Sequence, residues 1–374
     1  MSLLPDLMHW QRDHAARPRP DAVERRRVLL ASGTLPMPRD LLEYVLIPRA
    51  LRGREQLIHE HAAPMEGRIG LRTEVRLATT LDELLELALV GGDGDHGERR
   101  QRLEALATFD AVLGMAAMEA QTTFAQSKHA LKTFVSRLEK ALFDGTVESR
   151  VWSSHDVNRH GYVTRVTDQD PGPHRTRYVM SHLLSRRLMY LEGKHVPTIF
   201  HYRLKDRYAE WLKVLKQWND PKRRANAFHV QDRCGLLLVV PEARHIQPAV
   251  QAILRFLATL PHAAVIEEPS EHDHGNPDSS HEFKVVKMVV TVDGHTFEIQ
   301  FQTLADWFSA STATDTVNHD MYRFLQCLGF HFPRLFPMDA YGVDWTSAAV
   351  RRGLTEYKRR SLGIVFEYRM HRLR

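Results

Sequence analysis

Cysteine is scarce in this chain, with only Cys234 and Cys327 among 374 residues. Two cysteines are too few for a disulfide framework or for a zinc site built on thiolates. No apolar run approaches the ~20 residues that a membrane-spanning helix needs, and the Met1 end has no basic segment followed by an apolar core. The sequence therefore predicts a protein of the reducing cytoplasm with no membrane span.

Histidine is abundant, at 22 residues, but lacks the spacing of a helical zinc site. No His-Glu-x-x-His motif occurs, and His59 and His61 would point to different sides of a helix. Charge is only mildly unbalanced, with a formal net charge of +5 and a pI near 9.2. Clusters such as Arg186-Arg187 suit phosphate-bearing partners, and solvated helix faces produce the same clusters.

Four regions are expected along the chain. Residues 1–145 are expected to form a helical region of unknown role, in which Thr80-Leu81-Asp82-Glu83 is a capping box that opens a helix. Residues 146–195 are expected to be a β-rich linker or sheet extension, except that the apolar and basic stretch 178–191 favours a helix. Residues 196–330 follow as a sheet domain, and 331–374 as a C-terminal extension.

The expected sheet domain alternates strands and helices and then forms a hairpin. Strands are expected at 198–204 and 235–240, helices at 206–218 and 247–260, and an acidic loop at 267–282. This order predicts an α+β fold in which an N-terminal helical region precedes a mixed β-sheet flanked by helices. In the C-terminal extension, residues 363–366 have the composition of a strand.

An Asp293-Gly294 turn between two β-rich runs is a strong hairpin signal. In the second run, Glu298, Gln300 and Gln302 alternate with apolar residues, so period two places the polar side chains together on one face. That face is either the lining of a site or the ordinary solvated side of a half-buried strand.

Three groups of charged residues suit phosphate chemistry. Arg203 and Lys205 lie where a strand meets a helix, and Lys213 is eight residues after Lys205, so both ammonium groups fall near one helix face and could bracket a polyphosphate. Asp232 precedes a buried strand, and Glu298 lies on the polar face of the hairpin. Two carboxylates from separate strands with a basic fork are what metal-assisted phosphoryl transfer needs.

These groups belong to four short motifs that follow one another between residues 196 and 330. The motifs are Tyr202-Arg203-Leu204-Lys205, Gln231-Asp232-Arg233-Cys234-Gly235, Phe283-Lys284-Val285-Val286-Lys287 and Phe297-Glu298-Ile299-Gln300-Phe301-Gln302-Thr303. Their order and spacing resemble the synthetase domain of RelA/SpoT-type pyrophosphokinases. The resemblance covers about a third of the chain.

The resemblance implies a nucleotidyltransferase-like sheet that transfers the β,γ-pyrophosphate of ATP to a ribose 3′-hydroxyl with Mg²⁺. Asp232 and Glu298 would be the catalytic carboxylates and the metal ligands. The implied ATP contacts are Arg203, Lys205 and Lys213, and the implied acceptor contacts are Phe283, Lys287 and Gln300. The family usually has Tyr where this chain has Phe283, and the Phe ring keeps a stacking face.

The chain departs from the family chiefly on the acceptor side. Lys287 replaces the usual His, Leu237 and Gln302 replace two Arg residues, and Ala209 replaces a helix Ser. No hydrolase-domain set of His and Asp precedes the motifs. The hypothesis is therefore a pyrophosphokinase whose acceptor is an adenosine nucleotide or an RNA 3′ end such as that of tRNA, as in the toxic small synthetases of this superfamily.

Two alternatives stay open at this point. One is an inactive RelA/SpoT-like domain that binds a nucleotide, a nucleic acid or a protein partner, with the N-terminal helices as the partner-binding part. The other is a structural scaffold without a phosphate site. Fold alone does not decide between them.

Overall fold

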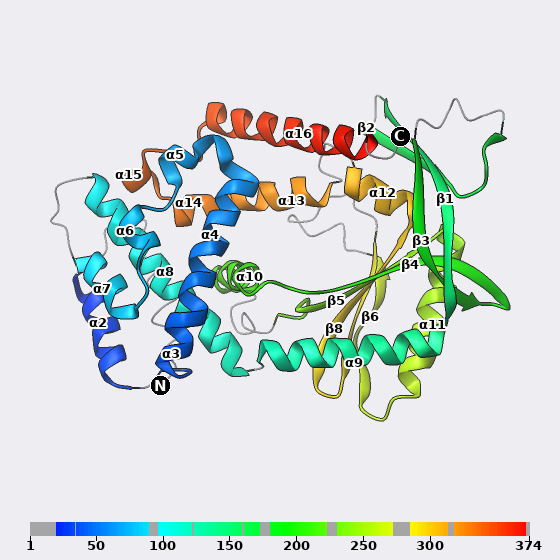
Figure 1. Cartoon of the computed structure of the whole chain (residues 1–374), viewed down its shortest axis with the longest axis horizontal. Coiled ribbons are helices and arrows are strands. Elements are labelled where there is room, and N and C mark those ends of the chain that lie inside the picture. The colour runs from blue at the N-terminus through cyan, green and yellow to red at the C-terminus, as the bar shows by residue number, and fades with distance from the viewer. Residues whose placement is uncertain are drawn as a thin grey trace. The chain divides into compact units, whose positions relative to one another are not determined.

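The computed structural model describes most of the chain. The described residues are 20–33, 35–89, 96–121, 123–158, 161–172, 180–222, 230–271, 285–312 and 318–371. They divide into two compact units, each assembled from separated segments. The helical unit comprises Met1–Phe124, Asp206–Val230 and Phe324–Tyr357, and the sheet unit comprises Ala125–Lys205, Gln231–Arg323 and Lys358–Arg374. The α+β class is confirmed (Figure 1).

The helical unit contains helices from all three of its segments. Its elements are α2 (Pro20–Ala31), α3 (Arg39–Leu41), η1 (Leu42–Leu46), α4 (Ile47–Ala62), η2 (Ala63–Met65), α5 (Glu66–Ile69), α6 (Thr73–Arg76), α7 (Leu81–Leu89), α8 (His96–Gln121), α10 (Arg207–Asn219), η6 (Cys327–His331), α14 (Phe332–Leu335) and α15 (Met338–Tyr341). Helices α13 (His319–Gln326) and α16 (Ala348–His371) contain residues of both units.

Two helix starts in this unit follow directly from local sequence. The capping box at α7 is confirmed, because the Glu83 N–H donates to Thr80 Oγ1 and the Thr80 N–H donates to Glu83 Oε2, each at 3.2 Å. At α10, Asp206 Oδ1 accepts from the backbone N–H groups of Tyr208 at 2.9 Å and Ala209 at 3.2 Å. Both helices therefore begin where a side-chain oxygen replaces a missing backbone acceptor.

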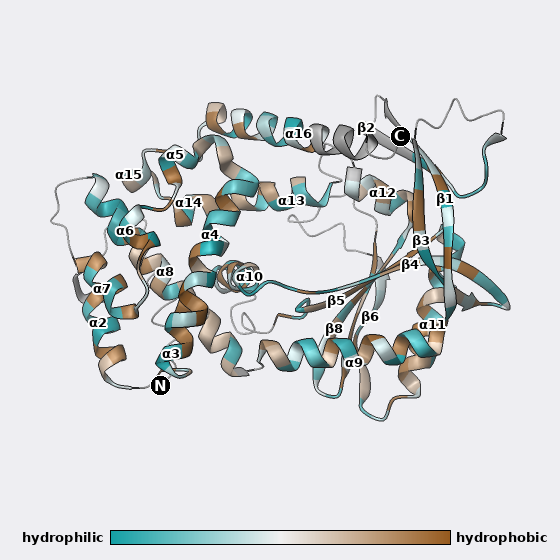
Figure 2. Ribbon diagram, viewed as in Figure 1, coloured by the Kyte–Doolittle hydropathy of each residue, from teal (hydrophilic) through white to brown (hydrophobic). Residues whose placement is uncertain are grey.

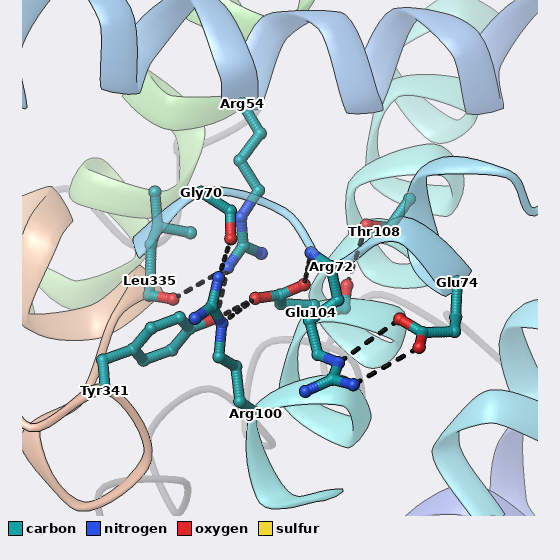
Figure 3. Close-up of polar contacts among 9 residues, drawn as sticks. All are labelled: Arg54, Gly70, Arg72, Glu74, Arg100, Glu104, Thr108, Leu335 and Tyr341. Atoms are coloured by element: carbon teal, nitrogen blue, oxygen red, sulfur yellow. Dashed lines mark hydrogen bonds and ion pairs between the residues drawn. The ribbon is translucent and has the colours of Figure 1, made fainter. Parts of the chain in front are cut away.

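A buried polar network around Glu104 joins segments that are far apart in the sequence (Figure 3). Glu104 is fully buried, and its carboxylate accepts from the Arg72 backbone N–H at 2.7 Å, from Arg100 Nε at 2.7 Å and from the Tyr341 hydroxyl at 3.2 Å. Arg54 in turn donates to the Tyr341 hydroxyl oxygen at 2.8 Å. The network ties α4 and α8 to α15, and burial makes each of its polar contacts costly to lose.

Close packing in the same unit depends on two glycines. A Cβ at Gly114 would lie 2.2 Å from the Trp211 ring, and a Cβ at Gly53 would lie 2.3 Å from Tyr208. Real Cβ atoms do not approach so closely, so α8 and α4 accept the aromatic residues of α10 only because these positions lack side chains.

The sheet unit contains an eight-stranded mixed sheet in the order β2-β1-β3-β4-β5-β8-β7-β6. Its strands are β1 (Phe143–Asn158), β2 (Gly161–Thr167), β3 (Met180–Leu191), β4 (Lys194–Leu204), β5 (Cys234–Val240), β6 (Ala263–Glu271), β7 (Val286–Val292) and β8 (His295–Thr303). Strands β5 and β8 are parallel, and the other six neighbouring pairs are antiparallel. The hairpin around Asp293-Gly294 is confirmed, and both turn residues have positive φ, at 49° and 78°.

Helices α9 (Phe124–Leu142) and α11 (Ile246–Ala258) cover one face of this sheet. Their apolar residues, including Phe134 and Ile253, form one core with Leu236 and Leu238 of β5 and with Phe297 of β8. Figure 2 shows hydrophobic and hydrophilic residues alternating along α9, as its amphipathic sequence dictates. On the opposite face, Leu304 and Phe308 of α12 (Leu304–Thr312) pack on Val239 and Ile199.

Three local expectations are wrong. The stretch expected to be a helix at 178–191 is instead strand β3 over its described part, because β1 and β4 pair with it on either side. Residues 363–366 belong to helix α16, not to a strand. The beginning of the expected acidic loop is the end of β6, which accommodates Pro269 through register shifts around Glu267 and Ser270.

Among the described residues, no helix combines the length and the apolar character that crossing a bilayer requires.

Candidate functional site

Strand register gathers the polar residues of the sheet unit on the face opposite α9 and α11. Arg203 pairs with Gly235, Gly235 with Glu298, Glu298 with Val289, and Val289 with Glu267. Side chains of directly paired residues lie on the same side of a sheet. This transverse row therefore brings Arg203 of β4, Glu298 of β8 and Glu267 of β6 to one surface, called the polar face below.

Gly235 leaves room for Arg203 on this face. A Cβ at Gly235 would lie 3.5 Å from Arg203 Cγ and 3.6 Å from its Nε, so the arginine side chain passes directly over the glycine. Gly235 belongs to β5, the strand between Arg203 and Glu298. A long cationic side chain thus passes over a position without a side chain, on the strand next to that of Glu298, and its guanidinium suits a phosphate oxygen.

Lys205 and Asp232 meet where β4 ends and β5 is about to begin. Lys205 Nζ is 2.7 Å from Asp232 Oδ2, and the side chains are 20 % and 14 % exposed. The Lys205 backbone N–H also donates to the Arg233 carbonyl at 2.9 Å. The antiparallel pairing of β4 and β5 causes this meeting, so two residues predicted for ATP and metal are in direct contact.

Glu298 is held from both sides by residues that the sequence assigned to the acceptor. Gln300 Nε2 donates to Glu298 Oε1 at 2.7 Å, and Lys287 Nζ is 3.7 Å from Glu298 Oε2. The Glu298 side chain is only 12 % exposed. The polar face around Glu298 is therefore an organised cluster of polar side chains, not the freely solvated side of a strand.

Glu267 belongs to the same cluster and was not identified from the sequence. Its Oε2 is 3.8 Å from Lys287 Nζ, and its Oε1 accepts from Gln231 Nε2 at 2.7 Å. Pro269 and the acidic composition of 267–282 favour a loop, so the sequence does not predict that Glu267 lies in a strand. No alternation in the sequence points to it, because residues 263–266 are all apolar and a register shift between Val265 and Glu267 moves Glu267 off the face on which Val265 packs.

Two predicted site residues are not among the described residues of the sheet unit. Lys213 lies half-buried in α10, which belongs to the helical unit. Phe283, predicted to stack on the acceptor base, lies outside the described residues. Both assignments stay predictions.

At its other end the sheet surface is covered by aromatic residues. His201, two residues before Arg203 on β4, stacks on Trp307 of α12 with ring centroids 6.2 Å apart. Partial burial lowers the pKa of His201. This contact places two aromatic rings at the α12 end of the polar face, and both His201 and Arg203 are exposed.

The donor set can be tested against the Mg²⁺ that the resemblance implies. Asp232 and Glu298 supply carboxylate oxygens, which are the hard ligands that Mg²⁺ prefers. Within the described ranges, no group of three or more His, Cys, Asp and Glu is arranged to hold a metal ion. Asp232 and Glu298 each have a lysine beside them, so they would hold Mg²⁺ only together with nucleotide phosphate oxygens and water, which is the usual mode of Mg²⁺ with phosphorylated substrates.

The chain matches no protein-family model, and no curated protein matches its sequence. Function is therefore inferred from the residues of the polar face and from their chemistry.

Proposed function

We propose that the sheet unit catalyses Mg²⁺-dependent transfer of pyrophosphate from ATP to the 3′-hydroxyl of a nucleotide or of an RNA such as tRNA. The observation that carries the proposal is the row Arg203, Gly235 and Glu298, in which the strand pairing places a cation and a carboxylate on either side of a glycine that leaves the space between them unfilled by a side chain of its own. This transfer requires a cationic group that binds phosphate and a carboxylate that takes the proton of the acceptor hydroxyl.

In this reaction the acceptor 3′-oxygen bonds to the β-phosphorus of ATP, and the bond between that phosphorus and the α,β-bridging oxygen breaks. AMP leaves with the bridging oxygen, and the acceptor proton passes to a base. Glu298 is the base in this scheme, and the hydrogen bond from Gln300 to its Oε1 orients the carboxylate. Arg203 and Lys205 bind phosphate oxygens of ATP. Bound Mg²⁺, held by Asp232 and Glu298, would offset charge on the phosphates.

Lys205 has to exchange partners when ATP binds. In the free protein its ammonium is bound to Asp232. An arriving polyphosphate offers Lys205 a new anion, and the departing lysine frees Asp232 Oδ2 for a cation. ATP and Mg²⁺ are therefore expected to bind together.

The test is transfer of label from γ-labelled ATP to separate acceptors, namely GDP, GTP, AMP, ATP and bulk tRNA, with purified protein and Mg²⁺. Label should move to one acceptor and be lost with Asp232→Ala or Glu298→Gln, while Glu268→Gln, an exposed neighbour on β6, should keep it. No transfer to any acceptor, or transfer indifferent to both site variants, would reject the proposal.

A second candidate is a domain that binds a nucleotide or nucleic acid without turnover. It is favoured by one observation, that each predicted metal ligand already has a lysine beside it, Lys205 at Asp232 and Lys287 at Glu298. Calorimetry would then show binding of a nucleotide without Mg²⁺, and measurable transfer would remove this candidate.

A further inference from the structure

Glu267 contacts both halves of the candidate site. Its Oε1 accepts from Gln231 Nε2 at 2.7 Å, and Gln231 directly precedes Asp232 in the chain. Its Oε2 is 3.8 Å from Lys287 Nζ, which is 3.7 Å from Glu298 Oε2. The Glu267 carboxylate thus anchors the segment that carries Asp232, the first predicted metal ligand. It also shares Lys287 with Glu298, the second predicted metal ligand.

The Lys287 ammonium is shared between the carboxylates of Glu267 and Glu298. Both N···O distances exceed the 2.7–2.9 Å range typical of a charge-assisted hydrogen bond. Lys287 therefore lies between two carboxylates of nearly equal pull and is bound tightly to neither. Because Coulomb attraction rises as the separation falls, removing the charge of one carboxylate should draw the ammonium onto the other.

We propose that Glu267 is a positioning residue of the candidate site, which holds Lys287 away from Glu298 so that this carboxylate is open to a divalent cation. The inference rests on the proposed function and adds to it a residue outside the family-like motifs. Lys287 and the cation compete for Glu298 Oε2, and Glu267 weakens the hold of the lysine in that competition.

The chain supplies a matched pair of variants. Glu267→Gln removes the negative charge and keeps an oxygen that can accept from Gln231. Glu268→Gln makes the same charge change at the next residue of β6, which is exposed. A change found only in the first variant therefore reports on the Lys287 contact and not on net charge.

The probe is Mn²⁺ in place of Mg²⁺, titrated into the full-length protein with a non-hydrolysable ATP analogue and followed by electron paramagnetic resonance. Glu267→Gln should weaken Mn²⁺ binding about tenfold, as expected for one strengthened charge-assisted contact. The Mg²⁺ concentration for half-maximal transfer should rise by a similar factor. Glu268→Gln should change neither.

Lys287→Met provides the decisive arm. Added to Glu267→Gln, it removes the competing ammonium and should restore Mn²⁺ affinity, which a merely structural role of Glu267 would not allow. Thermal melts check that all variants are folded. If Glu267→Gln binds Mn²⁺ as Glu268→Gln does, or if Lys287→Met fails to restore binding, the inference is overturned while transfer by the wild type stands. A wild type that neither transfers label nor binds Mn²⁺ overturns the proposed function, and the role of Glu267 with it.

Discussion

Lys205 and Asp232 neutralise one another at 2.7 Å, although each is expected to serve a ligand of opposite charge. Lys205→Ala should lower ATP affinity about 10- to 100-fold, the usual range for a lost charged contact of ~1.5–3 kcal/mol. Calorimetry measures the ATP affinity of each variant. Lys194→Ala, at the exposed start of β4, the strand that precedes Lys205, is the control and should bind ATP like the wild type. Equal affinities in the two variants would exclude Lys205 from the ATP site.

Gly235 predicts a graded series. Alanine places a Cβ in ordinary contact with Arg203, at 3.5 and 3.6 Å, and should bind ATP nearly as the wild type does. Valine suits a strand but adds two methyl groups where Arg203 lies. Gly235→Val should therefore melt at a similar temperature and lose ATP affinity as much as Arg203→Ala does. A Gly235→Val protein with normal affinity would show that Arg203 need not cross the glycine.

The hydroxyl of Tyr341 is predicted to be a stabilising link in the helical unit. It accepts from Arg54 at 2.8 Å and donates to Glu104 at 3.2 Å (Figure 3). Tyr341→Phe keeps the ring but removes the hydroxyl, so Arg54 and Glu104 each lose a buried hydrogen bond. The free energy of unfolding should therefore fall by about 1–3 kcal/mol. Chemical denaturation measures the change. Tyr357→Phe, at a partly exposed position of α16, should leave the stability within ~0.5 kcal/mol of the wild type.

His331 should make the stability depend on pH. Burial, with Lys216 and Arg334 nearby, lowers the pKa of His331 to about 3 in the folded protein. The unfolded chain, with a pKa near 6.5 for this group, then binds a proton that the folded protein refuses. The contribution of His331 is thus fully present above about pH 6.5 and is lost as the pH falls toward 3.

Denaturation at several pH values between 4 and 7 tests this sign. His331→Gln should flatten the fall in stability on the acidic side, since glutamine does not titrate. His262→Gln, at an exposed position, should leave the slope unchanged. A wild-type slope that His331→Gln does not alter would mean that His331 is protonated in the folded state.

Elements with strong local signals were predictable from the sequence. Asp293-Gly294 fixes a tight turn because both residues adopt positive φ, and Asp206 begins α10 because its carboxylate takes two free N–H groups. The sequence indicates Arg203, Gly235 and Glu298 only as members of motifs that follow one another along the chain. These residues pair in one row because β5 lies between β4 and β8, and no local sequence pattern specifies that strand order.

Where prediction from sequence was wrong, tertiary contacts outweighed local preference. The apolar and basic residues of β3 lack period two, yet β1 and β4 supply hydrogen bonds on both edges, and buried Arg186 pairs with Asp168. Glu267 was missed for a related reason. Pro269 indicates the end of a strand, but β6 continues past it by changing its pairing register.

The chain passes between the units more than once, and this limits how the gene can be divided. Strands β4 and β5 are adjacent in the sheet, yet the segment between them supplies α10 to the helical unit. A fragment starting at residue 125 would still carry Trp211 and Tyr208 but would lack Gly114 and Gly53, against which they pack. Truncation at that point should therefore yield an insoluble product.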